Sequence, residues 1–268
     1  MRPPSGDRVG GHVVVTGASR GVGAAIARAF ACAGAKVSVV ARNAQALNVV
    51  ADEIGASAVA ADVGDPAALE GLVSTLEATH GPVDVLVNNA ALAWLEPVAA
   101  MGIEHTNQTI DVNLRAPVEL VRQVLPGMLE RGSGSVVNIC SIGGISAFPT
   151  LTLYGATKSA LSMFTTGLQR EIAGSGVTAA IVLLGEVSDT GMNELAHASP
   201  SVDAAARRLA RIRALPVVTP EQVGARIVDA VIRRKTFVGI PRGVGALEAL
   251  RVLPTRLTDA FFTGIART

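Results

Sequence analysis

Short apolar runs alternate with longer stretches of helical periodicity along this chain. The apolar runs are residues 12–16, 36–41, 57–61, 83–87, 134–140, 177–184 and 236–240. They are rich in valine and isoleucine and apolar at consecutive positions, which is typical of strands covered on both faces in a parallel sheet. The helical stretches are residues 21–33, 43–54, 66–79, 105–130 and 152–174, with a further set between 190 and 232. The alternation predicts an α/β fold with a doubly wound parallel sheet.

Turn and capping residues indicate where these elements begin and end. Gly34, Gly55 and Gly81 stand where helices are expected to stop, because glycine readily adopts the left-handed conformation that closes a helix. The pair Asp65-Pro66 predicts an N-cap followed by the first turn of another helix. The sequence has no repeat and no low-complexity linker, so we expect residues 1–268 to form a single domain.

Two segments differ from this regular pattern. Residues 185–219 are rich in serine, threonine and proline, and we expect them to form a mobile lid over a substrate site. Residues 243–268 form an amphipathic C-terminal tail. Three roles fit such a tail: it covers the substrate pocket, meets another subunit, or makes peripheral contact with a membrane surface.

Composition and charge narrow the class of protein. The chain has 268 residues and a net charge of +1, which gives no general attraction to nucleic acid or anionic membranes. Its two cysteines and four histidines lack the spacing of a disulfide framework or a metal site, so we expect no metal. The sequence shows no signal peptide and no apolar run near the about 20 residues of a membrane span. These features favour a cytoplasmic protein.

The stretch TGASRGVG, residues 16–23, joins the first predicted strand to the first predicted helix. Backbone N–H groups at a helix N-terminus carry partial positive charge, and Gly17, Gly21 and Gly23 would let a pyrophosphate approach the backbone closely. The spacing G-x-x-x-G-x-G differs from the G-x-G-x-x-G fingerprint, but the strand before it and the helix after it favour a dinucleotide site.

The end of the second predicted strand indicates which dinucleotide is bound. An acid there would bind a ribose 2′-hydroxyl, but the strand ends in Ala41-Arg42. Arg20 of the glycine loop is expected nearby. Two guanidinium groups suit a 2′-phosphate, because arginine forms charge-assisted bonds to phosphate oxygens, and this favours NADP over NAD. The alternative is that Arg42 is a solvated residue at the start of the second helix.

Tyr154 and Lys158 are four residues apart at the start of a predicted helix, which places both on one face. A nearby ammonium group stabilises a phenolate and lowers the pKa of a tyrosine, so the pair suits general acid–base work. Ser141 follows the fifth predicted strand, Asn88-Asn89-Ala90 end the fourth, and Asp62 ends the third. Polar residues therefore gather at the carboxyl edge of the sheet, where ligands of open α/β folds bind.

Together these motifs resemble the short-chain dehydrogenase/reductase family, in its standard single-domain form, over residues 10–240. The resemblance implies a Rossmann-type sheet of seven strands in the order 3-2-1-4-5-6-7 with helices on both faces. It implies NADP(H)-dependent interconversion of a carbonyl and an alcohol, with Asn113, Ser141, Tyr154 and Lys158 as the catalytic residues. The cofactor-binding residues that it implies are Gly17, Ser19, Arg20, Gly21, Val22, Gly23, Arg42, Asp62, Val63, Asn89, Ala90, Tyr154, Lys158, Val187 and Thr190.

The resemblance also assigns individual roles. Tyr154 exchanges the hydroxyl proton, Lys158 lowers its pKa and binds the nicotinamide ribose, and Ser141 binds the substrate oxygen. Asn113 holds a water in a proton relay. The chain departs from the family pattern at Ala91, where glycine is usual.

A second departure lies at Leu184-Gly185, where Pro-Gly is usual, and the threonine that follows this strand comes one residue late, at position 190. Neither departure removes a catalytic group.

The loop residues 92–95, 142–144 and 148–149 suggest an apolar pocket and hence a small apolar substrate. Two alternatives remain open at this point: a nucleotide-sensing or scaffold protein without turnover, and an NADP-dependent epimerase or dehydratase on a related fold. We expect a homodimer or a homotetramer and no nucleic-acid partner.

Overall fold

The seven predicted strands pair in parallel in a single sheet. The computed structural model describes residues 10–198, 203, 216–241 and 243–244. The strands are β1 (His12–Thr16), β2 (Lys36–Ala41), β3 (Ser57–Ala60), β4 (Val83–Asn88), β5 (Gly134–Ser141), β6 (Val177–Leu184) and β7 (Phe237–Ile240). Their order is β3-β2-β1-β4-β5-β6-β7, which confirms the Rossmann-type topology.

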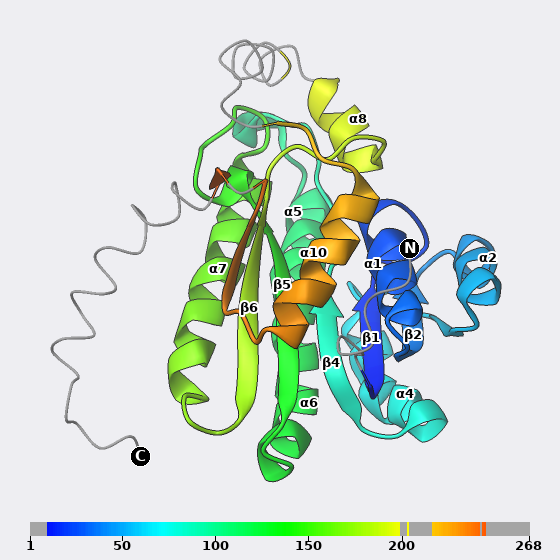
Figure 1. The fold of residues 1–268 in the computed structure, drawn as a ribbon. Helices are drawn as coiled ribbons and strands as arrows, with labels where there is room; N and C mark the ends of the chain where they lie inside the picture. The colour runs from blue at the N-terminus through cyan, green and yellow to red at the C-terminus, as the bar shows by residue number, and fades with distance from the viewer. Residues whose placement is uncertain (1–9, 199–202, 204–215, 242, 245–268) are drawn as a thin grey trace, which may run out of the picture.

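Helices connect the strands. They are α1 (Gly21–Cys32), α2 (Ala44–Ile54), α3 (Pro66–Leu69), α4 (Leu72–His80), α5 (Ile103–Ile110), α6 (Ala116–Glu130), α7 (Thr152–Glu171), α8 (Gly191–His197) and α10 (Pro220–Ile232). Short turns of other helical types lie at η1 (Val98–Ala100), η2 (Asp111–Arg115) and η3 (Ile142–Gly144). Figure 1 shows α1 and α10 side by side on one face of the sheet, with α6 and α7 on the other.

Both faces of the sheet are covered, which is why its strands are apolar at consecutive positions. Val13 and Val15 of β1 pack into the core beneath α1, α2 and α10. Val14, between them, packs into the second core beneath α4, α6 and α7. Successive side chains of a strand point to opposite faces, so an uninterrupted apolar run is the pattern that two cores require.

The structure changes two predicted helices. The stretch expected as one helix over 66–79 is divided into α3 and α4, because Gly71 adopts a left-handed φ of 73° between them. The stretch expected over 105–130 begins at Ile103 and contains the π-helical turn η2. The predicted cap is confirmed: the side chain of Asp65 accepts the N–H of Ala67, and Pro66 occupies the first turn.

Part of the expected lid and most of the expected tail lie outside the described residues. Within the lid, α8 is described, and Val187 forms a parallel bridge with Val218. Residues 199–202 and 204–215 of the lid, and residues 245–268 of the tail, are not described. Among the helices of the described part, none is long and apolar enough to cross a membrane.

His12 is a buried titratable group at the amino edge of the sheet. Its Nδ1 lies 2.8 Å from the carbonyl oxygen of Gly81, which can only accept, so Nδ1 carries a proton. Its Nε2 lies 2.8 Å from the hydroxyl of Ser38. Burial is the largest effect on this ring and lowers the pKa of His12 below the ordinary 6.5. The folded state therefore disfavours the charged ring.

We expect the free energy of unfolding to fall between about pH 7 and pH 5, because the unfolded chain then binds a proton at His12 that the folded chain resists. The contribution of His12 is fully present above pH 6.5 and is lost as the pH falls toward the lowered folded pKa. Urea unfolding at several pH values measures this slope. His12→Gln should flatten it, and an unchanged slope in that variant would assign the pH dependence to other groups.

Candidate functional site

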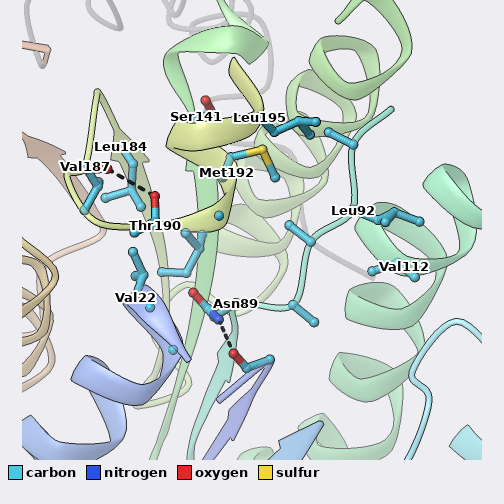
Figure 2. Close-up of a pocket in the computed structure, with 18 of the residues that line it drawn as sticks. Val22, Asn89, Leu92, Val112, Ser141, Leu184, Val187, Thr190, Met192 and Leu195 are labelled. Atoms are coloured by element: carbon cyan, nitrogen blue, oxygen red, sulfur yellow. Dashed lines mark hydrogen bonds between the residues drawn. The ribbon is translucent and has the colours of Figure 1, made fainter. Parts of the chain in front are cut away.

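A cavity of about 940 Å³ runs along the carboxyl edge of the sheet. It is lined by every candidate site residue from the sequence except one, Asn113. The shared lining consists of Gly17, Ser19, Arg20, Gly21, Val22, Gly23, Arg42, Asp62, Val63, Asn89, Ala90, Ser141, Tyr154, Lys158, Val187 and Thr190. Figure 2 shows Val22, Asn89, Leu184 and Thr190 around one part of this cavity, with Met192 and Leu195 on the adjacent α8. The glycine loop and the tyrosine–lysine pair thus share one cavity.

The glycine loop is a close-packed turn between β1 and α1. Gly17 and Gly21 have left-handed φ values of 67° and 56°, which favour glycine. A Cβ atom on Gly23 would overlap the carbonyl oxygen of Gly17. Asn89 holds the loop from β4, because its Nδ2 donates to the carbonyl oxygens of Thr16 at 2.9 Å and Gly17 at 3.3 Å. Side chains at these glycine positions would therefore prevent the loop from adopting this conformation.

Thr16 is a further structural residue of this loop that the sequence did not single out. Its Oγ1 accepts the backbone N–H groups of Asn89 and Ala90, each at 3.1 Å. The hydroxyl of a strand-end threonine thereby joins the ends of β1 and β4. In the sequence, this role of Thr16 was indicated only by its position immediately before Gly17, the first glycine of the loop.

Ser141, Tyr154 and Lys158 come together at the middle of the cavity. Ser141 ends β5, and its Oγ accepts the N–H of Gly143 at 3.1 Å. Tyr154 and Lys158 lie on the first turns of α7, and the side chains of Ser141 and Tyr154 are hydrogen-bonded. The Nζ of Lys158 donates to the carbonyl oxygen of Ile139 at 2.9 Å and lies 5.9 Å from the centre of the Tyr154 ring.

The pKa of Tyr154 moves in the direction opposite to the sequence expectation. Burial raises the pKa of Tyr154 to about 12, and the hydrogen bond from Ser141 offsets only part of this. Lys158 is also buried, and burial lowers the pKa of its ammonium group. The expected fall in the tyrosine pKa is therefore wrong for the chain by itself, because desolvation of the phenolate is the largest effect on it.

Asn113 lies beside the cavity instead of lining it. It is fully buried in η2, where its Nδ2 donates to the carbonyl oxygen of Leu92 and its Oδ1 accepts the N–H of Leu92, both at 2.8 Å. Its Nδ2 also donates to the hydroxyl of Thr157 at 3.1 Å. The side chain thus fixes the loop after β4 against α7.

Both arginines line the cavity. Arg20 precedes α1, and a Cβ atom on Gly191 of α8 would be 3.3 Å from its guanidinium. Arg42 Nη1 lies 3.7 Å from Asp62 Oδ2. The end of β2 itself carries no acid, and the carboxylate near Arg42 comes from the segment after β3. The pair is solvent-exposed, so its attraction is weak.

Thr190 forms the start of α8. Its Oγ1 donates to the carbonyl oxygen of Val187 at 3.1 Å (Figure 2). The same oxygen accepts the N–H of Asn193 at 3.2 Å. These bonds fix the position at which the chain turns from β6 into α8.

An apolar cluster surrounds one side of Tyr154. Ala93 and Leu151 are buried with it, and the partly buried members that pack against them are Leu95, Phe148, Met192 and Leu195. Met192 and Leu195 bring part of α8 into contact with this cluster. Trp94 was expected in the pocket wall, but it stacks on His105 of α5 instead. The described residues contain no group of three or more acidic, histidine or cysteine side chains that could hold a metal ion.

Comparison with known proteins matches residues 11–200 to the short chain dehydrogenase family. The chain is 36% identical over 234 residues to the ketoacyl reductase HetN of a Nostoc species, covering 85% of this chain and 78% of that protein. Actinorhodin polyketide ketoreductase, in a variant crystallised with NADPH, is 31% identical with a TM-score of 0.77, covering 86% and 95% of the two chains.

A serine dehydrogenase complexed with NADP+ is 30% identical with a TM-score of 0.73, covering 85% of this chain and 93% of that one. The matched segment contains the glycine loop, Ser141, Tyr154 and Lys158. The chain therefore belongs to the short-chain dehydrogenase/reductase family of oxidoreductases.

Proposed function

We propose that this protein is an NADP(H)-dependent oxidoreductase that interconverts a carbonyl and an alcohol on a small apolar substrate. The observation that carries this proposal is the single cavity shared by the glycine loop and the group Ser141, Tyr154 and Lys158. Two of the relatives are named as reductases of ketoacyl and polyketide compounds. The proposal includes a cytoplasmic location and a homodimer or a homotetramer.

The residues of the cavity fit a dinucleotide phosphate. Gly17 and Gly21 have left-handed φ values, and Gly23 packs directly against the carbonyl oxygen of Gly17. Because these three residues are glycines, no side chain of theirs covers the backbone at the start of α1, which suits a pyrophosphate. Arg20 and Arg42 both line this cavity and would hold a 2′-phosphate. The bound cofactor would supply the hydride. Solved relatives crystallised with NADP+ or NADPH support this assignment.

In the proposed reaction Tyr154 handles the proton. With its pKa raised to about 12, the phenol of the chain by itself keeps its proton throughout the neutral range. It is therefore ready to donate that proton to a carbonyl oxygen that gains negative charge during reduction. Ser141, hydrogen-bonded to Tyr154, would donate to the same oxygen and stabilise its charge. Lys158 would bind the ribose and supply positive charge beside the phenol.

The apolar cluster around Tyr154 supports the substrate class. Ala93, Leu151 and Met192 line the cavity on the side of the reacting hydroxyl. Burial of an apolar substrate against these side chains would exclude water from the proton transfer. We therefore propose an uncharged ketone or secondary alcohol with an apolar body.

Cofactor binding tests the proposal directly. We expect NADPH to bind more tightly than NADH, and Arg42→Ala to weaken NADPH binding by about tenfold or more, since a charge-assisted bond contributes about 1.5–3 kcal/mol. NADH affinity should stay the same, because its ribose lacks the phosphate. Titration followed by the fluorescence of the reduced nicotinamide measures both constants.

Arg28→Ala is the matched control. Arg28 lies on α1 and, like Arg42, is close to a carboxylate, here Glu53 at 2.7 Å, but it is not part of the cavity lining. Equal affinities of the wild type for NADPH and NADH would contradict the assignment, and so would an unchanged preference in Arg42→Ala. A chain that binds NADPH but consumes it with no carbonyl of a broad panel would favour the alternative of a nucleotide sensor.

A further inference from the structure

We propose that Trp94, Glu96 and His105 form a clamp that positions the wall of the substrate pocket and thereby sets substrate affinity. We call these three residues the Glu96 clamp. They lie outside the cavity lining and outside the group Ser141, Tyr154 and Lys158. The kinetic part of this inference rests on the proposed function, whereas the structural part does not.

The clamp joins the loop after β4 to α5. The rings of Trp94 and His105 are stacked, with centres 3.7 Å apart and planes within 9° of parallel. The Nδ1 of His105 lies 2.8 Å from Oε1 of Glu96. An ionised carboxylate can only accept, so Nδ1 donates this bond in both the neutral and the charged ring. His105 is thus held on one side by the indole and on another by the carboxylate.

Glu96 also joins the loop after β4 to the loop after β5. Its backbone N–H donates to the carbonyl oxygen of Thr150 at 3.1 Å. Thr150 has a left-handed φ of 66°, which is unusual for threonine, and it lies between the cavity-lining residues Phe148 and Leu151. One residue therefore fixes the loop after β4 by its side chain and the loop after β5 by its backbone.

The loop after β4 is fixed at its other end as well. Leu92 exchanges two hydrogen bonds of 2.8 Å with the side chain of Asn113. Between Leu92 and the clamp lies Ala93, which is buried in the cluster around Tyr154, and Leu95 packs against that cluster. Anchors at both ends hold a short segment without regular structure, so its apolar side chains keep a defined place in the wall.

The Glu96 clamp contains buried polar atoms that lower the stability of the fold. Glu96 Oε2 and Trp94 Nε1 are buried and have no hydrogen-bond partner among the residues that the structure describes. Leaving buried polar atoms unpaired destabilises a fold, and apolar side chains of similar volume would avoid this cost. Local features that oppose stability are expected where function requires them, and here they lie directly behind the substrate wall.

The test compares Glu96→Ala and His105→Ala with the wild type. On a ketone turned over by the wild type, we expect KM to rise about tenfold, as for the loss of one hydrogen bond to a charged group, with kcat changed by less than about twofold. NADPH affinity should not change, because the clamp lies away from the glycine loop. His105→Asn keeps a nitrogen donor near the position of Nδ1 and should restore most of the KM. Glu104→Ala removes an exposed neighbouring carboxylate and is the matched control.

Two measurements need no substrate. Trp94 is the only tryptophan, so its emission and its quenching by acrylamide report the stack directly, and both should change in His105→Ala. Amide hydrogen exchange should accelerate at 92–96 and 148–151 in Glu96→Ala, and stay unchanged at residues 16–23. Unchanged exchange at the first two segments would overturn the clamp, whatever the activity. Faster exchange with no carbonyl reduced even by the wild type would retain the clamp and reject the proposed function. Faster exchange with unchanged KM would overturn its role in substrate affinity.

Discussion

Replacement of Tyr154 by phenylalanine is expected to reduce turnover by a factor of about 100 to 10,000, the usual range for the loss of a general acid. The ring is retained, so its packing against Ala93 and Leu151 should survive. Only the hydroxyl that would carry the proton is lost. The Oγ of Ser141 still accepts the N–H of Gly143, but its O–H loses Tyr154 as a partner and can turn toward the cavity that Ser141 lines. NADPH consumption with a ketone of the panel, followed by absorbance, measures the change.

NADPH affinity provides the control for Tyr154→Phe. The hydroxyl contributes to chemistry in the proposed mechanism, so the dissociation constant of NADPH should remain within about twofold of the wild type. A variant that keeps more than about a tenth of its activity would contradict the role of Tyr154 as the acid. A variant that also loses NADPH binding would indicate that the hydroxyl supports the site structurally.

Gly23→Ala should abolish NADPH binding, with a loss of affinity of about 100-fold or more, because the N-terminus of α1 would have to move. The added Cβ would be fixed directly on the backbone of α1 and would overlap the carbonyl oxygen of Gly17, which belongs to the backbone of a turn held by Asn89. Neither can rotate away as a flexible side chain would. We also expect the free energy of unfolding to fall by about 1–3 kcal/mol, as for other overpacked buried positions. Nicotinamide fluorescence and urea unfolding measure the two effects.

Gly167→Ala is the matched control for this substitution. Gly167 lies inside α7, and a Cβ atom there would meet nothing within 4 Å. Alanine favours a helix over glycine by about 0.5–1 kcal/mol, so this variant should be slightly stabilised and should bind NADPH normally. Normal NADPH affinity in Gly23→Ala would show that the loop can adjust and that the close approach at Gly23 is not required.

Local sequence patterns were enough to predict the strands, the start of α3 and the glycine loop after β1. The β-strands were predicted because each contributes to two cores, which requires apolar residues at consecutive positions. Asp65-Pro66 marked the start of α3 because a cap depends on residues two or three apart. The glycine loop could be identified for the same reason, since a tight turn before a helix constrains adjacent residues. The strand order came from the family resemblance and was confirmed by the structure.

The properties that depend on distant neighbours were decided only by the tertiary structure. The pKa of Tyr154 is set by its burial, to which Ala93 and Leu151 contribute, and so it rises where the spacing of Tyr154 and Lys158 alone predicted a fall. Trp94 does not lie in the pocket wall, where it was expected, because its ring stacks on His105 of α5. Glu96 came to link two loops through Thr150, which is 54 residues away. Desolvation and such contacts depend on which segments meet in space, and a pattern of neighbouring residues carries no information about that.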